Sequence, residues 1–457
     1  MKRQQLEILE ALFPQPDLLI RPADTLAYSY DNSQQQSIPA AVVFPRNEEQ
    51  IMALLRHCNQ WRLPLACRGK GTGTTGASIP PAGGIALSLE RMNRILDIDP
   101  DNRLARVQPG VTNQQLQQAA AEHGFFWPPD PTSAAVCTIG GNLACNAAGP
   151  RAVKYGTCRE NTLGLSAVTA SGSLVHTGVR TTKGVVGYDL TRLLIGSEGT
   201  LAVITEATLK LTPLPEARRT LQAVYPDVAT AATAVSAIMA QPVIPSALEF
   251  MDGQALHMVR NYSDPGLADG AGALLMIELE ESAAAIDAAS ERIAATAKIP
   301  GCLSVEIASS REQVQKLWRT RKALSPALRN IAPKKINEDV VVPVSRIPDL
   351  IHGLTELAKK HAITIVNFGH AGNGNIHVNL LIDPDDPQQL AQAGICLDEV
   401  FRLVLGLGGT LSGEHGVGLV KREFVRREID DPSLALMHQL KNLFDPNGIL
   451  NPGKTLP

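Results

Sequence analysis

Short alternating runs of hydrophobic and polar residues in the first half of the chain predict β-strands. Runs that alternate, or that are rich in β-branched residues, and that end at Gly, Pro or Asn are typical of strands. Such runs cover residues 41–44, 63–68, 85–89, 104–107, 163–170 and 201–205. Residues 47–59 instead carry the apolar spacing of a helix, which Asn47 is placed to cap. For residues 1–36 we expect a helix and a loop.

After Pro213 the pattern changes to apolar helices that alternate with strands. Helical spacing covers residues 228–239, 283–297, 312–328 and 388–405, and strand patterns cover residues 274–280, 363–368 and 376–382. The tail from Val420 predicts helices that end in D-P-N-G-I-L-N-P-G-K. This order of elements predicts an α+β domain with an antiparallel sheet covered by helices.

Length and charge narrow the possible classes of protein. A chain of 457 residues is too long for one hydrophobic core and predicts two or three domains. The formal net charge of −3 indicates no attraction to nucleic acid. No apolar run reaches the ~20 residues that span a bilayer, and the charged N-terminus lacks the apolar core of a secretory signal. We expect a cytoplasmic protein, with peripheral docking at the inner membrane left open.

The seven cysteines indicate reduced thiols rather than disulfides. They form no C-x-x-C pair and no iron–sulfur spacing, and their number is odd. They lie at positions 58, 67, 137, 145, 158, 302 and 396. An iron–sulfur cluster that served this protein would therefore belong to a partner subunit.

A glycine-rich loop at residues 68–76 predicts a phosphate-binding site. Its sequence R-G-K-G-T-G-T-T-G has four glycines in nine residues, which lets backbone N–H groups approach a phosphate closely. A Rossmann glycine loop opens a helix, but here A-S-I-P-P follows and cannot continue as one. We therefore expect a pyrophosphate-binding loop between two strands, with an ordinary tight turn as the alternative.

Two further stretches are rich in glycine and small polar residues. They supply backbone donors with little bulk to obstruct a planar ligand, although each taken singly is typical of a turn. The first comprises residues 128–133, 138–142, 146–149 and 154–156, and the second comprises residues 196–200.

Three of the ten histidines lie in two glycine-rich stretches near the end of the chain. His370 and His377 belong to G-H-A-G-N-G-N-I-H-V-N, and Glu414 and His415 belong to G-E-H-G-V-G. If residues 376–382 form a strand, His377 and Asn379 point to the same face. Two imidazoles and a carboxylate could hold one divalent metal, which suits zinc but also iron(II), cobalt or manganese. A further histidine would then be available as a base.

Taken in order, these stretches resemble a known family of flavoenzymes. Residues 39–215 resemble the FAD-binding domain of the vanillyl-alcohol-oxidase or p-cresol methylhydroxylase type. The motifs G-H-A-G-N-G-N-I-H-V-N, G-E-H-G-V-G and G-I-L-N-P-G-K resemble the D-2-hydroxyacid dehydrogenase branch. That branch includes D-lactate dehydrogenase, the flavin subunit of glycolate oxidase and D-2-hydroxyglutarate dehydrogenase.

The resemblance implies a two-subdomain FAD-binding domain and a cap domain with an antiparallel sheet and helices. The expected segments are residues 1–36 (helix and loop), 37–215 (FAD-binding domain), 216–419 (substrate- and metal-binding cap) and 420–457 (helices returning to the FAD domain). The implied FAD-binding residues are Arg68, Gly69, Lys70, Gly71, Thr72, Gly73, Thr74, Thr75, Gly76, Pro129, Asp130, Thr132, Ser133, Gly140, Gly141, Asn142, Asn146, Gly149, Tyr155, Gly156, Glu198, Gly199, Ile204 and Asn451.

The resemblance also implies roles around the substrate. His370, His377 and Glu414 would bind the metal, Asn379 close by would bind the substrate, and His415 would be the general base. Arg321 and Ser325, four residues apart on one helix face, align with the Arg and the Ser/Thr that bind the substrate carboxylate.

Three positions depart from the family pattern. Position 72 is Thr where relatives with covalently bound flavin have His, so FAD is expected to be non-covalent. Lys70 stands where many relatives have glycine. Asn337 stands where the hydroxyglutarate enzymes have a lysine for the distal carboxylate, which argues against that substrate, although Lys335 is near enough to substitute.

The expected activity is oxidation of a D-2-hydroxy acid to the 2-oxo acid, with hydride transfer to flavin N5. The electron acceptor would be a quinone, an electron-transfer flavoprotein or a cytochrome. A homodimer and a complex with an iron–sulfur subunit both remain open, the latter as in glycolate oxidase. A metal-dependent hydrolase that uses His370, His377 and Glu414 is the alternative from another class, but it leaves the glycine-rich stretches without a role.

Overall fold

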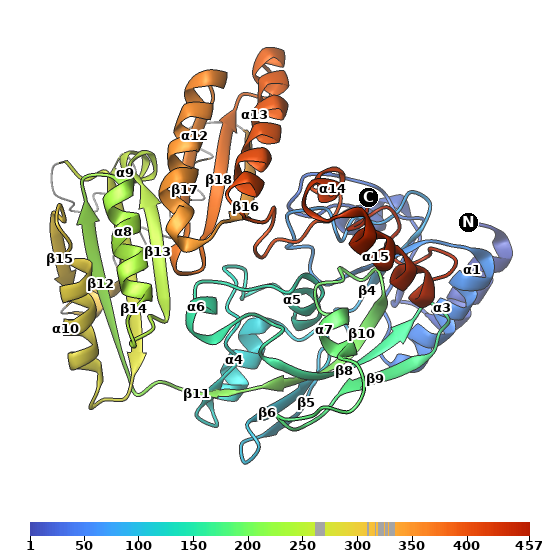
Figure 1. The fold of residues 1–457 in the computed structure, drawn as a ribbon. Helices are drawn as coiled ribbons and strands as arrows, with labels where there is room; N and C mark the ends of the chain where they lie inside the picture. The colour runs from blue at the N-terminus through green and yellow to red at the C-terminus, as the bar shows by residue number, and fades with distance from the viewer. Residues whose placement is uncertain (261–269, 309, 316, 319–323, 325–327, 329–333) are drawn as a thin grey trace. The chain divides into compact units, whose positions relative to one another are not determined.

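The computed structural model describes residues 1–260, 270–308, 310–315, 317–318, 324, 328 and 334–457 (Figure 1). They form two compact units. The first unit contains Met1–Gly149, Tyr155–Leu214 and Glu414–Pro457, and the second contains Pro150–Lys154 and Pro215–Gly413. The first unit therefore combines residues from both ends of the chain, and most of the second unit is the continuous stretch between them.

The first unit begins with a small sheet covered by helices. Its strand order is β1 (Leu18–Leu19), β2 (Ala41–Val43), β4 (Ile85–Ser88) and β3 (Leu65–Arg68), with β2 and β3 parallel to β4. The helices α1 (Arg3–Leu12) and α3 (Glu48–Trp61) contribute to its core. The Asn47 side chain accepts a hydrogen bond from the Gln50 N–H at 3.0 Å, which confirms the predicted helix cap.

A second, antiparallel sheet completes the first unit. Its order is β5 (Ile95–Asp99), β6 (Leu104–Val107), β10 (Ala202–Lys210), β8 (Thr162–Thr169) and β9 (Leu174–Gly178). Its core includes the fully buried Trp127 and residues of α4 (Asn113–Ala121), α5 (Ile139–Cys145) and α7 (Leu190–Leu194).

Short elements join and follow these sheets. They are α2 (Pro22–Thr25), η1 (Leu26–Tyr28), the β7 (Phe125–Phe126) and β11 (Thr212–Pro213) pair, η4 (Arg422–Phe424), α14 (Val425–Glu428) and α15 (Asp431–Phe444). The short helix α6 (Ala152–Tyr155) lies mostly in the segment Pro150–Lys154 of the second unit.

Residues 138–142 form the start of a helix rather than the turn that the sequence suggested. The glycines at 140 and 141 lower helix propensity. However, the Thr138 hydroxyl caps α5 by accepting the Gly141 N–H at 3.3 Å, and Ile139 and Leu143 are fully buried in the core. Capping and burial together outweigh the cost of the glycines.

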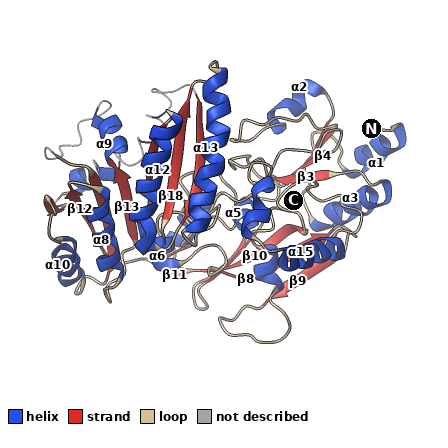
Figure 2. Ribbon diagram, turned by 45° about the horizontal axis from the view of Figure 1, so that its top comes forward, coloured by secondary structure: helices blue, strands red, loops and turns tan. Residues whose placement is uncertain are grey.

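The second unit is built on a seven-stranded antiparallel sheet. Its order is β15 (Ser304–Ile307), β12 (Ala217–Tyr225), β14 (Ala273–Glu281), β13 (Ala247–Asp252), β17 (Thr364–His370), β18 (Asn375–Ile382) and β16 (Lys334–Val341). Helices α8 (Val228–Met239), α10 (Ile286–Ala297), α12 (Ile347–His361) and α13 (Pro387–Gly406) pack against it (Figure 2). The helices α9 (Gly253–Arg260) and η2 (Val344–Arg346) are shorter.

This sheet confirms the predicted α+β architecture, but several of its strands were not predicted. The sequence pattern identified β14, β17 and β18, whereas β12, β13, β15 and β16 were missed. The missed β13 and β16 are the ones that bring acidic side chains to the histidines. The helix predicted at residues 312–328 lies largely outside the described residues.

Candidate active site

The two histidines of the second unit lie on a tight hairpin. His370 ends β17, η3 (Ala371–Asn373) makes the turn, and His377 is in β18. Gly374 has φ +73°, and a Cβ there would lie 1.9 Å from the Val342 carbonyl oxygen, so the turn requires glycine. The two imidazole rings meet edge to face with centroids 5.4 Å apart, and each residue is 8% exposed.

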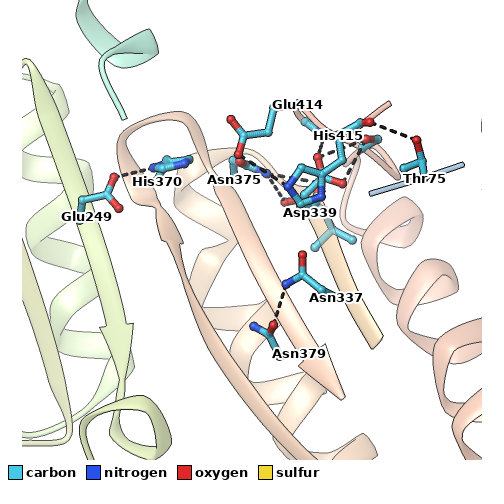
Figure 3. Close-up of polar contacts among 12 residues, drawn as sticks. Thr75, Glu249, Asn337, Asp339, His370, Asn375, Asn379, Glu414 and His415 are labelled. Carbon is cyan, nitrogen blue, oxygen red and sulfur yellow. Dashed lines mark hydrogen bonds and ion pairs between the residues drawn. The ribbon is translucent and has the colours of Figure 1, made fainter. Parts of the chain in front are cut away.

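A glutamate that the sequence analysis did not identify contacts the first histidine. Glu249 in β13 pairs in register with His370, and its Oε1 lies 2.5 Å from His370 Nδ1 (Figure 3). Glu249 is 1% exposed. Its signal in the sequence is a single acidic residue in the otherwise apolar run A-L-E-F-M that begins at Ala247.

A second acidic residue that the sequence analysis did not identify, Asp339, holds the residues just before Glu414. Asp339 in β16 is fully buried and pairs in register with His377. Its carboxylate accepts the Ser412 hydroxyl at 3.1 Å and the Gly413 N–H at 3.0 Å. Gly413 is the last residue of the second unit, so Asp339 fixes the point from which Glu414 continues.

His370, His377 and Glu414 form a cluster of potential metal ligands. One ligand atom from each lies within 4.8 Å of the other two. Two imidazole nitrogens and one carboxylate oxygen are donors that suit zinc, and three protein ligands leave a position for substrate. The donor set of these three residues therefore fits a divalent metal.

Asn379 lies on the same face of β18 as His377, but its side chain is fully engaged. Its Nδ2 donates to the carbonyl oxygens of Val366 at 3.1 Å and His377 at 3.0 Å, and its Oδ1 accepts from Asn337 Nδ2 at 2.6 Å (Figure 3). Asn379 therefore holds Asn337 in place, and Asn337 is the more exposed of the two.

The predicted carboxylate-binding residues Arg321 and Ser325 lie outside the described residues. Trp318, which precedes them, is described. Its indole Nε1 donates to Glu278 Oε2 at 3.0 Å.

In the first unit, the residues after Glu414 pack against the glycine-rich loop. The Thr75 carbonyl oxygen accepts the N–H groups of Leu419 at 2.8 Å and Val420 at 3.2 Å. The Thr75 hydroxyl donates to the His415 carbonyl oxygen at 3.3 Å (Figure 3). A Cβ at Gly418 would lie 2.2 Å from the Thr75 carbonyl oxygen, so this close approach requires glycine. The segment that bears the predicted base is thus joined to the predicted FAD loop.

Glu198 holds the same segment from another side. Its buried carboxylate accepts the N–H groups of Val417 and Gly418, each at 2.9 Å, and the Thr455 hydroxyl at 2.5 Å. Burial raises the pKa of Glu198, and these hydrogen bonds oppose that rise. Gly416 must be glycine, because a Cβ there would lie 2.1 Å from Glu198 Oε1.

The loop at residues 68–76 lies between β3 and β4, as predicted, and against the start of α5. A Cβ at Gly69 would lie 2.3 Å from Thr138 Oγ1. The Arg68 guanidinium donates to the carbonyl oxygens of Tyr28 at 2.8 Å and Tyr30 at 3.1 Å, and burial lowers its pKa. The glycine-rich loop and the Thr138 region, far apart in sequence, therefore form one surface.

Two family patterns cover most of the chain. Residues 39–178 match the pattern described as "FAD binding domain". Residues 214–455, more than half of the chain, match "FAD linked oxidases, C-terminal domain". The chain belongs to the FAD-linked oxidases. It is therefore an FAD-linked oxidoreductase, and the hydrolase alternative is set aside.

Relatives of this FAD-linked oxidase align over nearly its whole length. The "Glycolate oxidase subunit GlcD" of Bacillus subtilis is 40% identical over 94% of this chain and 92% of its own. The "D-lactate dehydrogenase" of Archaeoglobus fulgidus is 37% identical over 95% of this chain and 96% of its own.

A solved structure of p-cresol methylhydroxylase with substrate bound shows the same fold. It superposes with a TM-score of 0.79 at 17% identity and covers 100% of this chain and 97% of its own. The predicted FAD-binding domain of this type, with an antiparallel cap, is confirmed. Within the described residues, no helix has the length and apolarity needed to cross a bilayer.

The first unit fits FAD by an observation independent of the family. Arg68 Nε, Thr74 Oγ1 and Asn142 Nδ2 are buried and find no hydrogen-bond partner among the described residues. Leaving such groups unsatisfied costs about 1–3 kcal/mol each. All three belong to the predicted FAD-binding set, and a bound dinucleotide supplies acceptors and donors for them.

The predicted FAD residues near position 130 form turns and close backbone contacts. The Pro129 carbonyl oxygen accepts from Asn113 at 2.8 Å, and the Asp130 N–H donates to Ala148 at 3.2 Å. Gly149 has φ +117° and abuts Asp130, and Gly140 abuts Pro109. Thr132 and Ser133 lie in the turn that follows Pro131. Gly73 and Gly141 leave room for a ligand, because a Cβ at either would meet nothing closer than 3.4 Å.

Several other members of the predicted set have structural partners. Asn146 accepts from Thr157 and Arg159, Tyr155 packs edge to face on Phe126, and Gly156 has φ +78° beside Glu160. The Ile204 side chain is buried in the core, so only its backbone groups are available to a cofactor.

Asn451 and Gly199 meet where the C-terminal segment joins the unit. Asn451 Nδ2 donates to the Ala77 carbonyl oxygen at 3.2 Å and also to the Glu198 carbonyl oxygen. A Cβ at Gly199 would lie 3.2 Å from Asn451 Nδ2. Asn451 thus joins the residue that follows the loop at residues 68–76 to the glycine-rich stretch at residues 196–200.

Lys70 and Thr72, the two residues of the glycine-rich loop that depart from the family pattern, both contact nearby residues. Lys70 Nζ forms an ion pair with Glu90 at 2.7 Å, and the Thr72 carbonyl oxygen accepts from Asn32 at 3.1 Å. Asn32 N–H also donates to the Gly73 carbonyl oxygen at 2.9 Å, so neighbouring side chain and backbone support the loop.

Proposed function

We propose that this protein oxidises a small D-2-hydroxy acid to the 2-oxo acid with non-covalent FAD and one divalent metal, most simply zinc. The observation that carries the proposal is the His370, His377 and Glu414 cluster in a chain of the FAD-linked oxidases. Relatives named as a glycolate oxidase subunit and a D-lactate dehydrogenase support this class of substrate.

Different residues of the chain bind the substrate and accept its proton. When bound, FAD supplies a hydride acceptor and the metal supplies a Lewis acid that lowers the pKa of the substrate hydroxyl. His415 accepts the hydroxyl proton on an imidazole nitrogen. Arg321 and Ser325 bind the substrate carboxylate through a guanidinium fork and a hydroxyl.

The separation of roles between Glu414 and His415 supports His415 as the base. Glu414 belongs to the cluster of potential ligands, and the Glu414 Oε1 to His415 Nε2 distance is 3.9 Å. The main chain of His415 is held through Thr75, so its imidazole is carried on a fixed segment.

The Asn337–Asn379 pair supports a substrate without a second carboxylate. An amide at position 337 is neutral, and its Nδ2 is engaged by Asn379 at 2.6 Å. It cannot form the ion pair that a lysine would offer to a distal carboxylate. We therefore propose lactate or glycolate in preference to hydroxyglutarate.

An anaerobic screen of hydroxy acids tests this function. The purified yellow protein is mixed with D- and L-lactate, glycolate, malate and D-2-hydroxyglutarate, and loss of the flavin absorbance is followed. We expect bleaching by D-lactate or glycolate, slower bleaching by the dicarboxylates, and about one bound metal per chain by elemental analysis. A protein that takes up no FAD, or that no 2-hydroxy acid reduces, would contradict the proposal.

A second candidate is that the chain acts as the flavin subunit of a larger complex. The 40% identical relative is itself described as a subunit of glycolate oxidase, which favours this form of the function. Affinity purification from the native host followed by iron analysis tests it. An iron–sulfur protein present in stoichiometric amount supports the complex, and full activity of the isolated chain with a quinone or cytochrome acceptor argues against it.

A further inference from the structure

Glu249 is an acidic residue on an otherwise apolar face of β13. Ala247 and Met251 share its face, and its cross-strand partner on β14 is Met276. Glu249 is 1% exposed, and an ionised carboxylate in such surroundings is costly unless it is paired. Apolar packing does not explain a carboxylate at this position, whereas a hydrogen bond to the carboxylate does.

The hydrogen bond is made with Nδ1 of His370, a candidate metal ligand. Glu249 Oε1 lies 2.5 Å from His370 Nδ1, and the register of β13 against β17 places the two residues directly opposite each other. A carboxylate accepts but does not donate, so His370 carries its proton on Nδ1 in this pair. The lone pair of the neutral imidazole is then on Nε2, the nitrogen that would bind a metal.

We propose that Glu249 is a positioning residue that holds His370 in the orientation and tautomer required for metal binding. The inference rests on the proposed function, since it takes His370 as a ligand. Loss of a carboxylate partner behind a metal-binding imidazole typically weakens metal affinity about 10–100-fold.

The matched control lies on the same face of the same sheet. Glu278 pairs with Ala247, the residue two positions before Glu249, and is buried with 8% exposure. Its carboxylate accepts from Trp318 rather than from a histidine. Glu278→Gln therefore removes a buried charge from this sheet without removing a partner of the candidate metal ligands.

Metal affinity of the FAD-loaded protein tests the proposal. Wild type, Glu249→Gln, Glu249→Asp and Glu278→Gln are each equilibrated with Zn²⁺ and a competing chelator, and bound zinc is measured together with the flavin-to-protein ratio. We expect about 10–100-fold weaker zinc binding for both Glu249 variants, with flavin content unchanged. Glu278→Gln should bind zinc as wild type does.

A second readout separates positioning from a general structural role. If Glu249 acts through His370, excess Zn²⁺ should restore flavin reduction by the hydroxy acid in Glu249→Gln. Wild-type zinc affinity in either folded Glu249 variant would overturn the inference. The inference would also fail if zinc binding were weakened but excess Zn²⁺ did not restore flavin reduction. Wild-type protein that binds no metal would instead contradict the metal part of the proposed function, so the two failures are distinguishable.

Discussion

At the scale of single residues, the candidate site consists of ligands and of the side chains that hold them. His370 and His377 are ring to ring, and Glu249 and Asp339 lie opposite them in register on neighbouring strands. The sequence motifs identified the histidines but not the two acids, because Glu249 is a single acidic residue in an apolar run and Asp339 is one of several polar residues in the strand K-K-I-N-E-D-V-V. Only strand pairing reveals what each acid contacts.

Replacing His415 by alanine tests the assignment of the base. We expect His415→Ala to keep FAD and metal, because both are held by other residues, and to reduce its flavin about 10²–10⁴ times more slowly. Stopped-flow absorbance under anaerobic conditions measures the rate. His176→Ala is the control, because that exposed histidine contacts Ser166 on the β8–β9 hairpin. Equal rates for His415→Ala and wild type would remove His415 from the mechanism.

At the scale of elements, short glycine turns set the positions of the functional side chains. Gly374 closes the hairpin that carries both histidines, and Gly416 and Gly418 let the base segment approach Glu198 and Thr75. These glycines were visible in the sequence as parts of motifs. These glycines are in close contact with residues distant in the chain, namely the carbonyl oxygens of Val342 and Thr75 and the carboxylate of Glu198. Such contacts leave no local signature in the sequence.

Gly374→Ala tests the hairpin. The new Cβ would meet the Val342 carbonyl oxygen at 1.9 Å and would sit at φ +73°, so the turn must shift and the histidines with it. We expect loss of metal binding and a lower free energy of unfolding by about 1–3 kcal/mol.

Metal analysis and chemical denaturation measure these two effects. Gly394→Ala is the control, since a Cβ at that position in α13 meets nothing within 4 Å, and it should leave metal content unchanged. Retained metal and unaltered stability in Gly374→Ala would show that the hairpin tolerates the side chain.

At the scale of the whole molecule, contacts between distant parts of the chain complete the first unit. Lys454 Nζ donates to the carbonyl oxygen of Ala77 at 2.8 Å and to Asn451 Oδ1 at 3.1 Å, and also to the Ile79 carbonyl oxygen. The C-terminal segment thereby fastens the residues that follow the glycine-rich loop. Burial lowers the pKa of Lys454 to about 8.

This lowered pKa predicts how stability depends on pH. The unfolded lysine keeps its usual pKa of about 10.4, so the unfolded chain binds more protons than the folded chain between about pH 8 and that value. Lys454 should therefore contribute increasing stability as pH rises through this window and a constant amount below it.

Comparison of wild type with Lys454→Met tests this prediction. The difference in unfolding free energy, measured by chemical denaturation from pH 7 to pH 10, should shift in favour of wild type above about pH 8. Subtracting the variant removes the contribution of other titrating groups. A difference that is flat across this range would show that the Lys454 pKa is not lowered.

The sequence by itself determined the classes of element, the FAD-binding region and the residue types of the candidate metal site. Glycine spacing, histidine motifs and hydrophobic alternation are local properties, and they were sufficient for the α+β fold and the flavoprotein family. The strands β12, β13, β15 and β16 were missed because their patterns mix charged with apolar residues.

Only the tertiary structure decided which distant residues hold the site in place. Glu249 behind His370, Asp339 before Glu414, and Glu198 behind the segment after His415 are separated from these partners by tens to hundreds of residues. Strand register and the return of the C-terminal segment bring them together. The role of a buried carboxylate depends on the hydrogen-bond donor that it contacts. The fold, rather than the neighbouring residues in the chain, determines which donor that is.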